Sequence, residues 1–241
     1  MAFQPLRPDR DLTVLIPARA GSKRIRGKNT RLFAGKPLIQ WTIEAAQAAH
    51  VAQIIVSSDD PAIWPIARYY DLALHVRQPA HATDSSPDID WVLDVLPMVQ
   101  TPYVAICRPT SPFRTASTIR RGYAAFMASG ADSIRAVEKV TSPHPAKMWR
   151  LGARYMEPVM AGQHADGTPY HSSPTQSLPV VYIQNACLEI AAVASITATG
   201  TISGHRIAPF FTEPLEGVDL NTEEDWVKAE AIAVSYSVKA L

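Results

Sequence analysis

Short apolar runs alternate with amphipathic segments over the first half of this chain, and this alternation limits its fold more than any other feature. The apolar runs predict strands at 12–18, 52–60, 72–76, 103–107 and 131–137. The segments between them predict helices at 37–49, 60–71, 89–99 and 116–129, and Asp60 is expected to cap the second of these. Strands joined by helices of this length are typical of an α/β fold, in which helices cover both faces of a mainly parallel sheet.

The regular pattern stops at about residue 141 and resumes at about 180. The intervening stretch is rich in proline and has no clear period, so a disordered insertion is one interpretation. Its apolar side chains, among them Met148, Trp149 and Tyr155, instead favour a segment that packs against something, such as a second copy of the chain. Beyond it we predict strands at 180–193 and 205–212 and a helix at 222–237, capped by Thr222. We therefore predict a single domain, 1–241, with an inserted dimerisation or substrate segment at about 141–180.

Four polar loops follow the predicted strands of the first half, at 19–29, 57–60, 77–88 and 108–114. In open parallel sheets, ligands bind outside the carboxyl ends of the strands. Each of these loops falls at such an end. We therefore expect them to converge on one pocket.

The first of these loops is strongly basic. Six cationic side chains lie within thirteen positions, and no Asp or Glu occurs from Leu12 to Ile43; the six are Arg19, Lys23, Arg24, Arg26, Lys28 and Arg31. A loop of this kind can cradle an anion with its backbone N–H groups while its cations neutralise several oxygens. Lys28 has no acidic neighbour in the sequence, so we expect its ammonium to be available for phosphate.

The loop matches neither of the common phosphate-binding motifs. Five residues separate Gly21 from Gly27, where a P-loop has four, and Lys28 precedes Asn29 rather than Ser or Thr. The G-x-G-x-x-G fingerprint of dinucleotide-binding proteins is also absent. A solvated turn with scattered charges is the alternative interpretation. Nucleic acid is a weaker one, because the loop holds no aromatic residue for base stacking.

The composition excludes some classes of function. With a net charge of +1, 47% hydrophobic and 19% charged residues, the chain lacks the basic excess of a general nucleic-acid or membrane-surface binder. Cys107 and Cys187 lie in apolar runs and are expected in the core. No apolar run reaches the length of about 18 residues that a membrane span needs. We expect a cytoplasmic protein without nucleic-acid or membrane partners.

Six motifs occur in the order and spacing of one enzyme family: IPARAGSKRIRGKN, VSSDD, RPTSPFR, HPAKMW, YIQNA and GVDLNTEEDW. From about Leu12 to Ala233, the chain resembles the acylneuraminate cytidylyltransferases, or CMP-sialic acid synthetases. The resemblance implies a three-layer nucleotidyltransferase fold of the Rossmann-like type, usually dimeric. It also implies transfer of CMP from CTP to the anomeric hydroxyl of a 2-keto sugar acid, with Mg²⁺ as cofactor and pyrophosphate released.

The resemblance also implies roles for individual residues. Arg19, Lys28 and Asp219 would be catalytic, with Arg19 and Lys28 on the triphosphate. The nucleotide would bind to Arg19, Ala20, Gly21, Ser22, Lys23, Asn29, Arg77 and Asp84, and the sugar acid to Arg108, Thr110, Ser111, Lys147, Gln184 and Asn185. Asp219 and Asn221 would hold the metal. Asp84 is equally well explained as part of a turn. A helix-capping role is the alternative for Asp219, for which we favour metal binding.

Four positions depart from the family pattern. Arg26 stands where the family usually has Pro, and Arg108 where many members have Gln. Thr175 replaces an Arg, and Asn221 replaces a second metal-binding Asp. The first three bear on which sugar acid is used, and the last bears on the geometry of the metal site.

We therefore predict a cytidylyltransferase that activates a nonulosonic, sialic-acid-like sugar acid. An enzyme of the same fold for 3-deoxy-manno-octulosonate is one alternative. A nucleotide-binding protein that has lost catalysis is another, with Arg108 and Asn221 as its signs. The sequence does not distinguish among sialic, legionaminic and pseudaminic acids.

Overall fold

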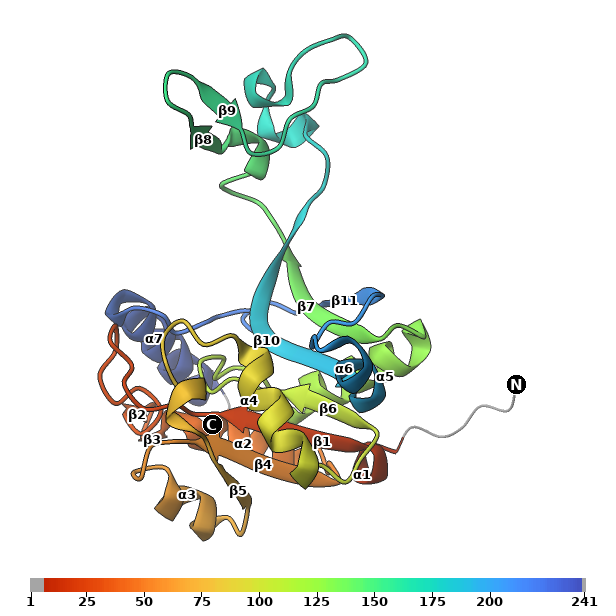
Figure 1. Cartoon of the computed structure of the whole chain (residues 1–241). Coiled ribbons are helices and arrows are strands. Elements are labelled where there is room, and N and C mark those ends of the chain that lie inside the picture. Colours follow the sequence, from red (N-terminus) through yellow and green to blue (C-terminus); the bar gives the residue numbers. More distant parts are fainter. Residues whose placement is uncertain (1–6, 240–241) are drawn as a thin grey trace. The chain divides into compact units, whose positions relative to one another are not determined.

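The computed structural model describes residues 7–239, and side chains up to residue 235. Two compact units make up the chain (Figure 1). The first consists of Met1–Ala136 and Asn185–Leu241, and the second of Val137–Gln184. The segment expected to interrupt the domain, 141–180, lies within the second unit.

A seven-stranded sheet organises the first unit, in the order β11-β7-β10-β6-β1-β4-β5. Its strands are β1 (Leu12–Pro17), β4 (Gln53–Ser58), β5 (Ala73–Val76), β6 (Tyr103–Ile106), β7 (Ser133–Lys139), β10 (Tyr182–Ala192) and β11 (Ile207–Phe211). β1 pairs in parallel with both β4 and β6, and β4 pairs in parallel with β5. β10 runs antiparallel to β6, with Glu189 opposite Ile106. The expected α/β fold with a mainly parallel sheet is confirmed.

Helices cover both faces of this sheet, so its central strands are buried on both sides. They are α1 (Pro8–Asp11), α2 (Leu38–Ala48), α3 (Trp64–Tyr69), α4 (Asp88–Val95), α5 (Ala116–Ser129), α6 (Val193–Thr199) and α7 (Glu223–Lys239). Val14 of β1 belongs to the core that α2 and α5 cover. The next residue, Leu15, belongs to the core beneath α4 and α6, as expected from the alternation of side chains along a strand (Figure 1).

The helix expected at 60–71 is shorter than predicted. α3 begins only at Trp64 and has no side-chain cap, so the expected cap by Asp60 is wrong. Asp60 instead accepts a hydrogen bond from the backbone of Ala62 at 2.9 Å, in a turn before the helix. The cap of α7 is confirmed, since Thr222 Oγ1 accepts from the backbone N–H of Asp225 at 3.2 Å. The sequence pattern missed α1, α6 and the small hairpin of β2 (Leu32–Phe33) and β3 (Lys36–Pro37).

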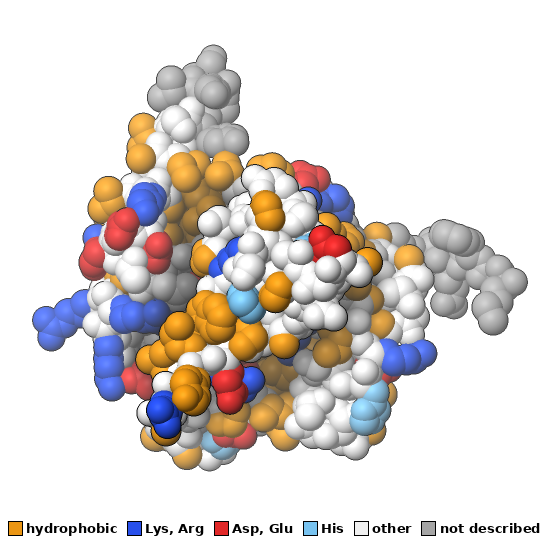
Figure 2. Space-filling model, turned by 90° about the horizontal axis from the view of Figure 1, so that it is seen from above, with side chains coloured by type: hydrophobic (Ala, Val, Ile, Leu, Met, Phe, Trp, Pro, Cys, Tyr) orange, Lys and Arg blue, Asp and Glu red, His pale blue; other side chains and the backbone are white. Residues whose placement is uncertain are grey.

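The second unit has little regular structure. It contains one two-stranded sheet, β8 (Trp149–Leu151) with β9 (Met156–Pro158), and three short 3₁₀ turns, Pro145–Lys147, Tyr170–Ser172 and Thr175–Ser177. Leu151, Tyr155 and Met156 are 83%, 72% and 57% exposed. Hydrophobic side chains are visible in orange on the surface shown in Figure 2. Exposed apolar side chains in this number are typical of a surface that binds another protein or ligand.

Among the described residues, no helix has both the length and the apolar character to cross a membrane. Cys107 and Cys187 are both buried and free, in the core beneath α2 and α5.

Candidate active site

Three of the four polar loops meet at one cavity. Because β1, β4, β5 and β6 are parallel, their carboxyl ends lie along the same edge of the sheet. The loops after β1, β5 and β6 enclose about 170 Å³ there. The lining residues are Pro17, Arg19, Ser22, Lys28, Asn29, Arg77, Asp88, Arg108, Pro109 and Thr110. Four of these side chains are cationic and one is a carboxylate, so the cavity is suited to an anion of several charges.

The basic loop after β1 is held in shape by buried contacts. Ile25, between the exposed Arg24 and Arg26, is 1% exposed and packs with Phe33 and Trp226. This anchor turns the neighbouring cations outward. Gly21 and Gly27 both have positive φ, at 73° and 59°, a backbone conformation that other residues rarely adopt.

Polar contacts fix the start of the same loop. Asp59, after β4, accepts from the backbone N–H of Ala20 at 2.7 Å. Asn29, which is 8% exposed, donates its amide N–H to the carbonyl of Arg19 at 3.3 Å. The polar loop at 57–60 thus supports the basic loop, and Asn29 ties the end of the basic loop to its beginning.

Arg19 and Lys23 share one carboxylate from a distant part of the chain. Asp84 accepts from Arg19 at 2.6 Å and lies 2.6 Å from Lys23 Nζ. The hydrogen bonds from Lys23 and Arg19 lower the pKa of Asp84. Arg19 and Lys23 therefore share one exposed carboxylate as their ionic partner.

Lys28 is placed differently from the expectation. Its ammonium does have a partner in the structure, because it donates to the carbonyl of Leu220 at 3.1 Å. Burial lowers its pKa below 10.5, the Asp219 carboxylate opposes this, and Arg24 and Arg19 add to the lowering. Its hydrogen-bond partner is a neutral carbonyl, and no carboxylate forms an ion pair with it among the described residues, so Lys28 remains well suited to bind phosphate.

Arg77 lies at the end of β5 and is 4% exposed. Its Nε donates to Ser57 Oγ at 3.2 Å, and its guanidinium lies 4.7 Å from the centroid of the Trp91 ring. Burial lowers the pKa of Arg77 to about 10, against the opposing effect of the Asp88 and Asp59 carboxylates. The group is charged at neutral pH, and among the described residues no carboxylate forms an ion pair with it.

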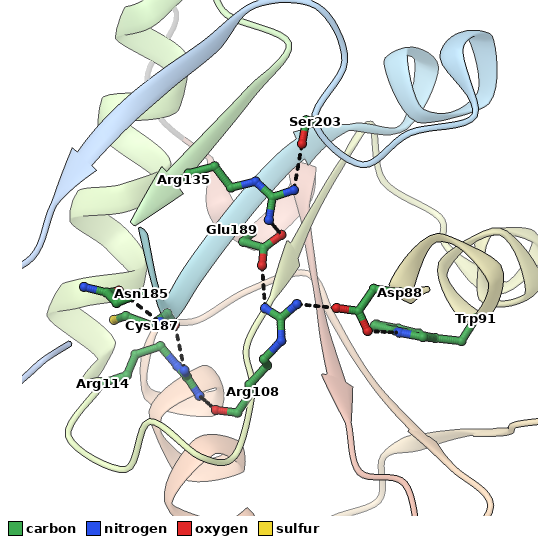
Figure 3. A network of polar contacts seen from close by, with 9 residues as sticks. All are labelled: Asp88, Trp91, Arg108, Arg114, Arg135, Asn185, Cys187, Glu189 and Ser203. Atoms are coloured by element: carbon green, nitrogen blue, oxygen red, sulfur yellow. Dashed lines mark hydrogen bonds and ion pairs between the residues drawn. The ribbon is translucent and has the colours of Figure 1, made fainter. Parts of the chain in front are cut away.

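Arg108, at the end of β6, lies in a network of ionic contacts (Figure 3). Its two terminal nitrogens contact Glu189 of β10 and Asp88 at the start of α4. Glu189, which is 2% exposed, also pairs with Arg135 of β7. Burial lowers the pKa of Arg108, but Glu189 and Asp88 outweigh it, so the pKa lies above its ordinary value. This arginine is held as a charged group.

Asp88 and the Arg108 backbone each have a second contact. Trp91 donates its indole N–H to Asp88 at 2.9 Å. Burial raises the pKa of Asp88, but Arg108 and Trp91 lower it by more, so the net shift is downward. Arg114, which is 2% exposed, donates to the carbonyls of Cys187 at 2.7 Å and Arg108 at 3.0 Å, and so fixes the loop after β6.

The candidate metal residues lie beside Lys28. Asp219 Oδ2 accepts from the Asn221 amide at 2.6 Å, whereas its Oδ1 is buried and has no hydrogen-bond partner among the described residues. An unpaired carboxylate oxygen fits a divalent cation that takes its remaining ligands from phosphate and water. The oxygen of Asn221 contacts Arg24 at 3.5 Å, so in this conformation Asn221 turns its nitrogen toward Asp219. No group of three or more His, Cys, Asp or Glu side chains suited to a metal occurs in the part of the chain that the structure describes.

The predicted sugar-acid residues fall into separate groups. Arg108 and Thr110 line the cavity, while Ser111 beside them is 1% exposed and has a hydroxyl without a partner among the described residues. Asn185 is engaged within the first unit, where it donates to Thr212 at 3.0 Å and accepts from the backbone of Cys187 at 3.2 Å.

Lys147 and Gln184 belong to the second unit. There the Lys147 ammonium donates to the carbonyls of His171 at 2.8 Å and Ser173 at 2.5 Å. Their roles toward a sugar acid stay predictions.

A larger cavity in the first unit does not contain the predicted residues. It encloses about 630 Å³ and is lined by Phe33, Trp41 and Phe113, with three carboxylates (Glu44, Glu213 and Glu216) against two cations (Lys36 and Arg114). This lining carries a net negative charge, which disfavours a triphosphate. We therefore place the candidate active site in the smaller, cationic cavity.

Sequence reasoning missed Asp88 and Glu189. Asp88 could have been considered, since it ends a polar loop and begins a helix. Glu189 lies within an apolar strand, and a buried carboxylate there required a cationic partner. That requirement was the available signal, but it did not identify Arg108 and Arg135 as the partners.

An open, mainly parallel sheet with a cationic cavity at the carboxyl ends of its strands is the architecture of a nucleotide-binding α/β protein. The family described as Cytidylyltransferase matches residues 13–156. The CMP-N,N'-diacetyllegionaminic acid synthase of Legionella pneumophila is 31% identical over 235 residues, covering 92% of this chain and 95% of that protein. The chain belongs to the cytidylyltransferase family and is a nucleotidyltransferase.

Two further comparisons are consistent with this assignment. The N-acylneuraminate cytidylyltransferase of Escherichia coli is 36% identical over 111 residues, covering 45% of this chain and 26% of that longer protein. The structure of CMP:2-keto-3-deoxy-manno-octonic acid synthetase complexed with CTP superposes with a TM-score of 0.63 at 16% identity, covering 94% of this chain and 99% of that one. At this identity the superposition shows the shared fold.

Proposed function

We propose that this enzyme transfers CMP from CTP to the anomeric hydroxyl of a nonulosonic, sialic-acid-like sugar acid and releases pyrophosphate. The observation that carries the proposal is the cavity lined by Arg19, Lys28, Arg77 and Arg108 at the ends of three strands. The near-full-length similarity to a legionaminic acid synthase supports the choice of acceptor.

The basic loop would bind the triphosphate. Lys28 and Arg77 have no carboxylate in hydrogen-bonding contact among the described residues, so each brings an available positive charge. Arg19 and Lys23 would exchange Asp84 for phosphate oxygens, at little cost, because Asp84 is an exposed partner. Ser22, Asn29 and the backbone at Ala20 and Gly21 would complete the cradle.

In the reaction, the acceptor oxygen forms a bond to the α-phosphorus and gives up its proton to solvent, as the bond from the α-phosphorus to the oxygen of the β-phosphate breaks. Negative charge grows on the phosphate oxygens and on the departing pyrophosphate. Fixed cations are worth most when they are aimed at charge that develops in the transition state. We assign this role to Lys28 and Arg19.

We further propose that Mg²⁺ binds Asp219. When bound, it would neutralise phosphate charge and help to orient the triphosphate. The support is the unpaired Asp219 oxygen beside Lys28. Asn221 would join the site only after turning its amide oxygen toward Asp219.

We also propose that the enzyme is a homodimer joined through the second unit and works in the cytoplasm. Apolar side chains such as Leu151 and Tyr155 are exposed on that unit, and burying them in an interface is favourable. Two free cysteines are consistent with a reducing compartment. Light scattering at micromolar concentration tests the dimer, and a fully active monomer would contradict it.

Pyrophosphate release tests the function directly. CTP should support turnover with a sialic, legionaminic or pseudaminic acid only when Mg²⁺ is present, whereas ATP and GTP should give little. Preference for 3-deoxy-manno-octulosonate would identify the alternative acceptor. Thermal stabilisation by CTP without turnover on any acid would identify a binding protein that has lost catalysis.

A further inference from the structure

Neutral groups hold Arg77 at the cavity that it lines. Its Nε donates to Ser57 Oγ at 3.2 Å, and its Nη2 donates to the Ser57 carbonyl at 3.4 Å. Its guanidinium also lies 4.7 Å from the centroid of the Trp91 ring. Among the described residues, no carboxylate forms an ion pair with Arg77. The cation therefore stays available to a ligand, while its position depends on the hydroxyl of Ser57.

The Ser57 hydroxyl has a second partner on the neighbouring strand. Ser57 of β4 and His75 of β5 lie opposite each other in the parallel pair, and Ser57 Oγ lies 3.0 Å from His75 Nδ1. The other ring nitrogen, His75 Nε2, lies 3.3 Å from Asp94 Oδ2 on α4. Both Ser57 and His75 are buried. A series of contacts therefore runs from Arg77 at the cavity to Asp94 on α4.

The chemistry of the groups gives each contact in this series a direction. An arginine nitrogen is always a donor, so Ser57 Oγ accepts from Arg77. The single proton of the Ser57 hydroxyl then has His75 Nδ1 as its acceptor, since Ser57 Oγ contacts no other acceptor among the described residues. His75 must therefore carry its proton on Nε2, where it faces the Asp94 carboxylate.

The charged groups around His75 keep its ring neutral at physiological pH. Burial lowers the pKa of His75, and the Asp94 carboxylate on α4 opposes this. Arg77 on the same strand and His81 in the following turn add to the lowering. Protonation of Nδ1 would remove the acceptor of the Ser57 hydroxyl and place a second cation beside Arg77. Acid should therefore loosen the hold on Arg77.

We propose that His75 is a positioning residue for Arg77 and acts through Ser57, whose proton it accepts so that the hydroxyl oxygen faces the arginine. Asp94 selects the required tautomer by holding the ring proton on Nε2. The inference rests on the proposed function, in which Arg77 binds the nucleotide. His75 itself does not line the cavity. Because a positioned cation loses less freedom when a ligand binds, the effect is expected in the affinity for CTP.

Two substitutions of His75 separate the acceptor from the ring. His75→Phe keeps an aromatic ring but removes the acceptor, and should raise the dissociation constant for CTP about fivefold, the effect of one hydrogen bond. His75→Asn keeps an oxygen near the place of Nδ1 and should raise it less than about twofold. Calorimetric titration at about pH 8 measures both, with the melting temperature as a check of folding. Equal affinities in the two variants would overturn the inference.

A double-variant cycle tests whether His75 acts through Ser57. Ser57→Ala should weaken CTP binding at least as much as His75→Phe does, because Arg77 loses the hydroxyl itself. The double variant should bind CTP no more weakly than Ser57→Ala alone, since His75 then has no hydroxyl to orient. Losses that multiply would show that His75 acts by another route and would overturn the inference.

The pH dependence of CTP binding distinguishes positioning from packing. In the wild type, the dissociation constant should rise as the pH falls through the lowered pKa of His75. His75→Asn should show only the smaller change that comes from titration of the nucleotide phosphates. Identical profiles in the two proteins, or tighter binding by the wild type in acid, would overturn the inference.

His81→Asn is the matched control. His81 Nδ1 lies 3.4 Å from the same Asp94 carboxylate, but His81 does not contact Ser57 among the described residues. The variant should keep the wild-type affinity for CTP at about pH 8 and the rise in acid. A loss equal to that of His75→Phe would overturn the inference. A wild-type protein that does not bind CTP would overturn the proposed function as well, whereas one that binds CTP no more tightly than His75→Phe overturns this inference alone.

Discussion

The basic loop after β1 and the network after β6 both place arginines at one cavity, but they treat positive charge in opposite ways. In the loop, Arg19 pairs with the exposed Asp84, and Lys28 donates to a carbonyl. In the network, Arg108 contacts two carboxylates, and one of them, Glu189, is 2% exposed. The loop cations can therefore exchange partners for a ligand, while the network is fixed by the cost of exposing buried charge.

This difference shows that a count of cations around a cavity does not describe its chemistry. Four cationic side chains line the cavity, but only those with weak or exposed partners are available to a phosphate. Breaking a buried ion pair is costly, because removal of one partner leaves the other charge buried without a partner and without water. The following substitutions test whether the two regions differ in this way.

Lys28→Ala should produce the largest effect, a fall in turnover of about 10²–10³, because one charge-assisted contact to the transition state is lost. The melting temperature should change little, since the structure gives Lys28 a single hydrogen bond, to the Leu220 carbonyl, and no ion pair among the described residues. Steady-state kinetics and thermal melting measure the two effects. Arg26→Ala is the control, because it removes the same charge from an exposed position of the same loop. If Lys28→Ala keeps near-normal turnover, as Arg26→Ala should, the loop is a solvated turn.

Asp219→Ala should lower turnover by about 10², and added Mg²⁺ should recover part of the loss, because the defect is in metal affinity. Extra Mg²⁺ should not rescue Lys28→Ala. Titration of activity against Mg²⁺ distinguishes the two. Asn221→Asp is the companion variant and should shift the Mg²⁺ dependence to lower concentration. An Asp219→Ala enzyme with a normal Mg²⁺ dependence would assign Asp219 to structure alone.

Glu189→Gln tests the network and should act on stability. It leaves Arg108 and Arg135 close to a neutral amide, and breaking a buried pair in this way costs about 3 kcal/mol of unfolding free energy. Urea denaturation measures the change. Arg108→Gln combined with Glu189→Gln should lose less than the sum of the single variants, because the double variant no longer contains that pair. Strict additivity would show that the two residues do not interact.

Asp84→Asn should have the smallest effect, and in the favourable direction. Freeing Arg19 and Lys23 from an exposed carboxylate should tighten binding of inorganic triphosphate by about twofold to fivefold, the scale of a surface ion pair. The melting temperature should stay unchanged. Calorimetric titration at two salt concentrations measures this. Weaker binding would instead give Asp84 a direct part in holding the nucleotide.

Much of the fold was predictable because it depends on local patterns. Successive side chains of the run Leu12–Pro17 point alternately into two cores. Thr222 caps the last helix, as its spacing from Asp225 indicated. The start of α3 was not predicted, because a turn at Asp60 competed with a helix cap at the same residue. The convergence of the loops after β1, β5 and β6 was also predictable, since parallel strands end at one edge.

The sequence by itself determined the alternating strands and helices, the position of the basic loop and the motifs that mark the family. Only the tertiary structure decided which charges remain available. Asp84 lies 65 positions from Arg19, and Glu189 lies 81 positions from Arg108. Ion pairs depend on distance and burial after folding, and neither can be read from spacing along the chain. A stretch without acidic residues in the sequence therefore became a loop in which Arg19 and Lys23 are paired with Asp84, whereas Lys28 donates to a backbone carbonyl.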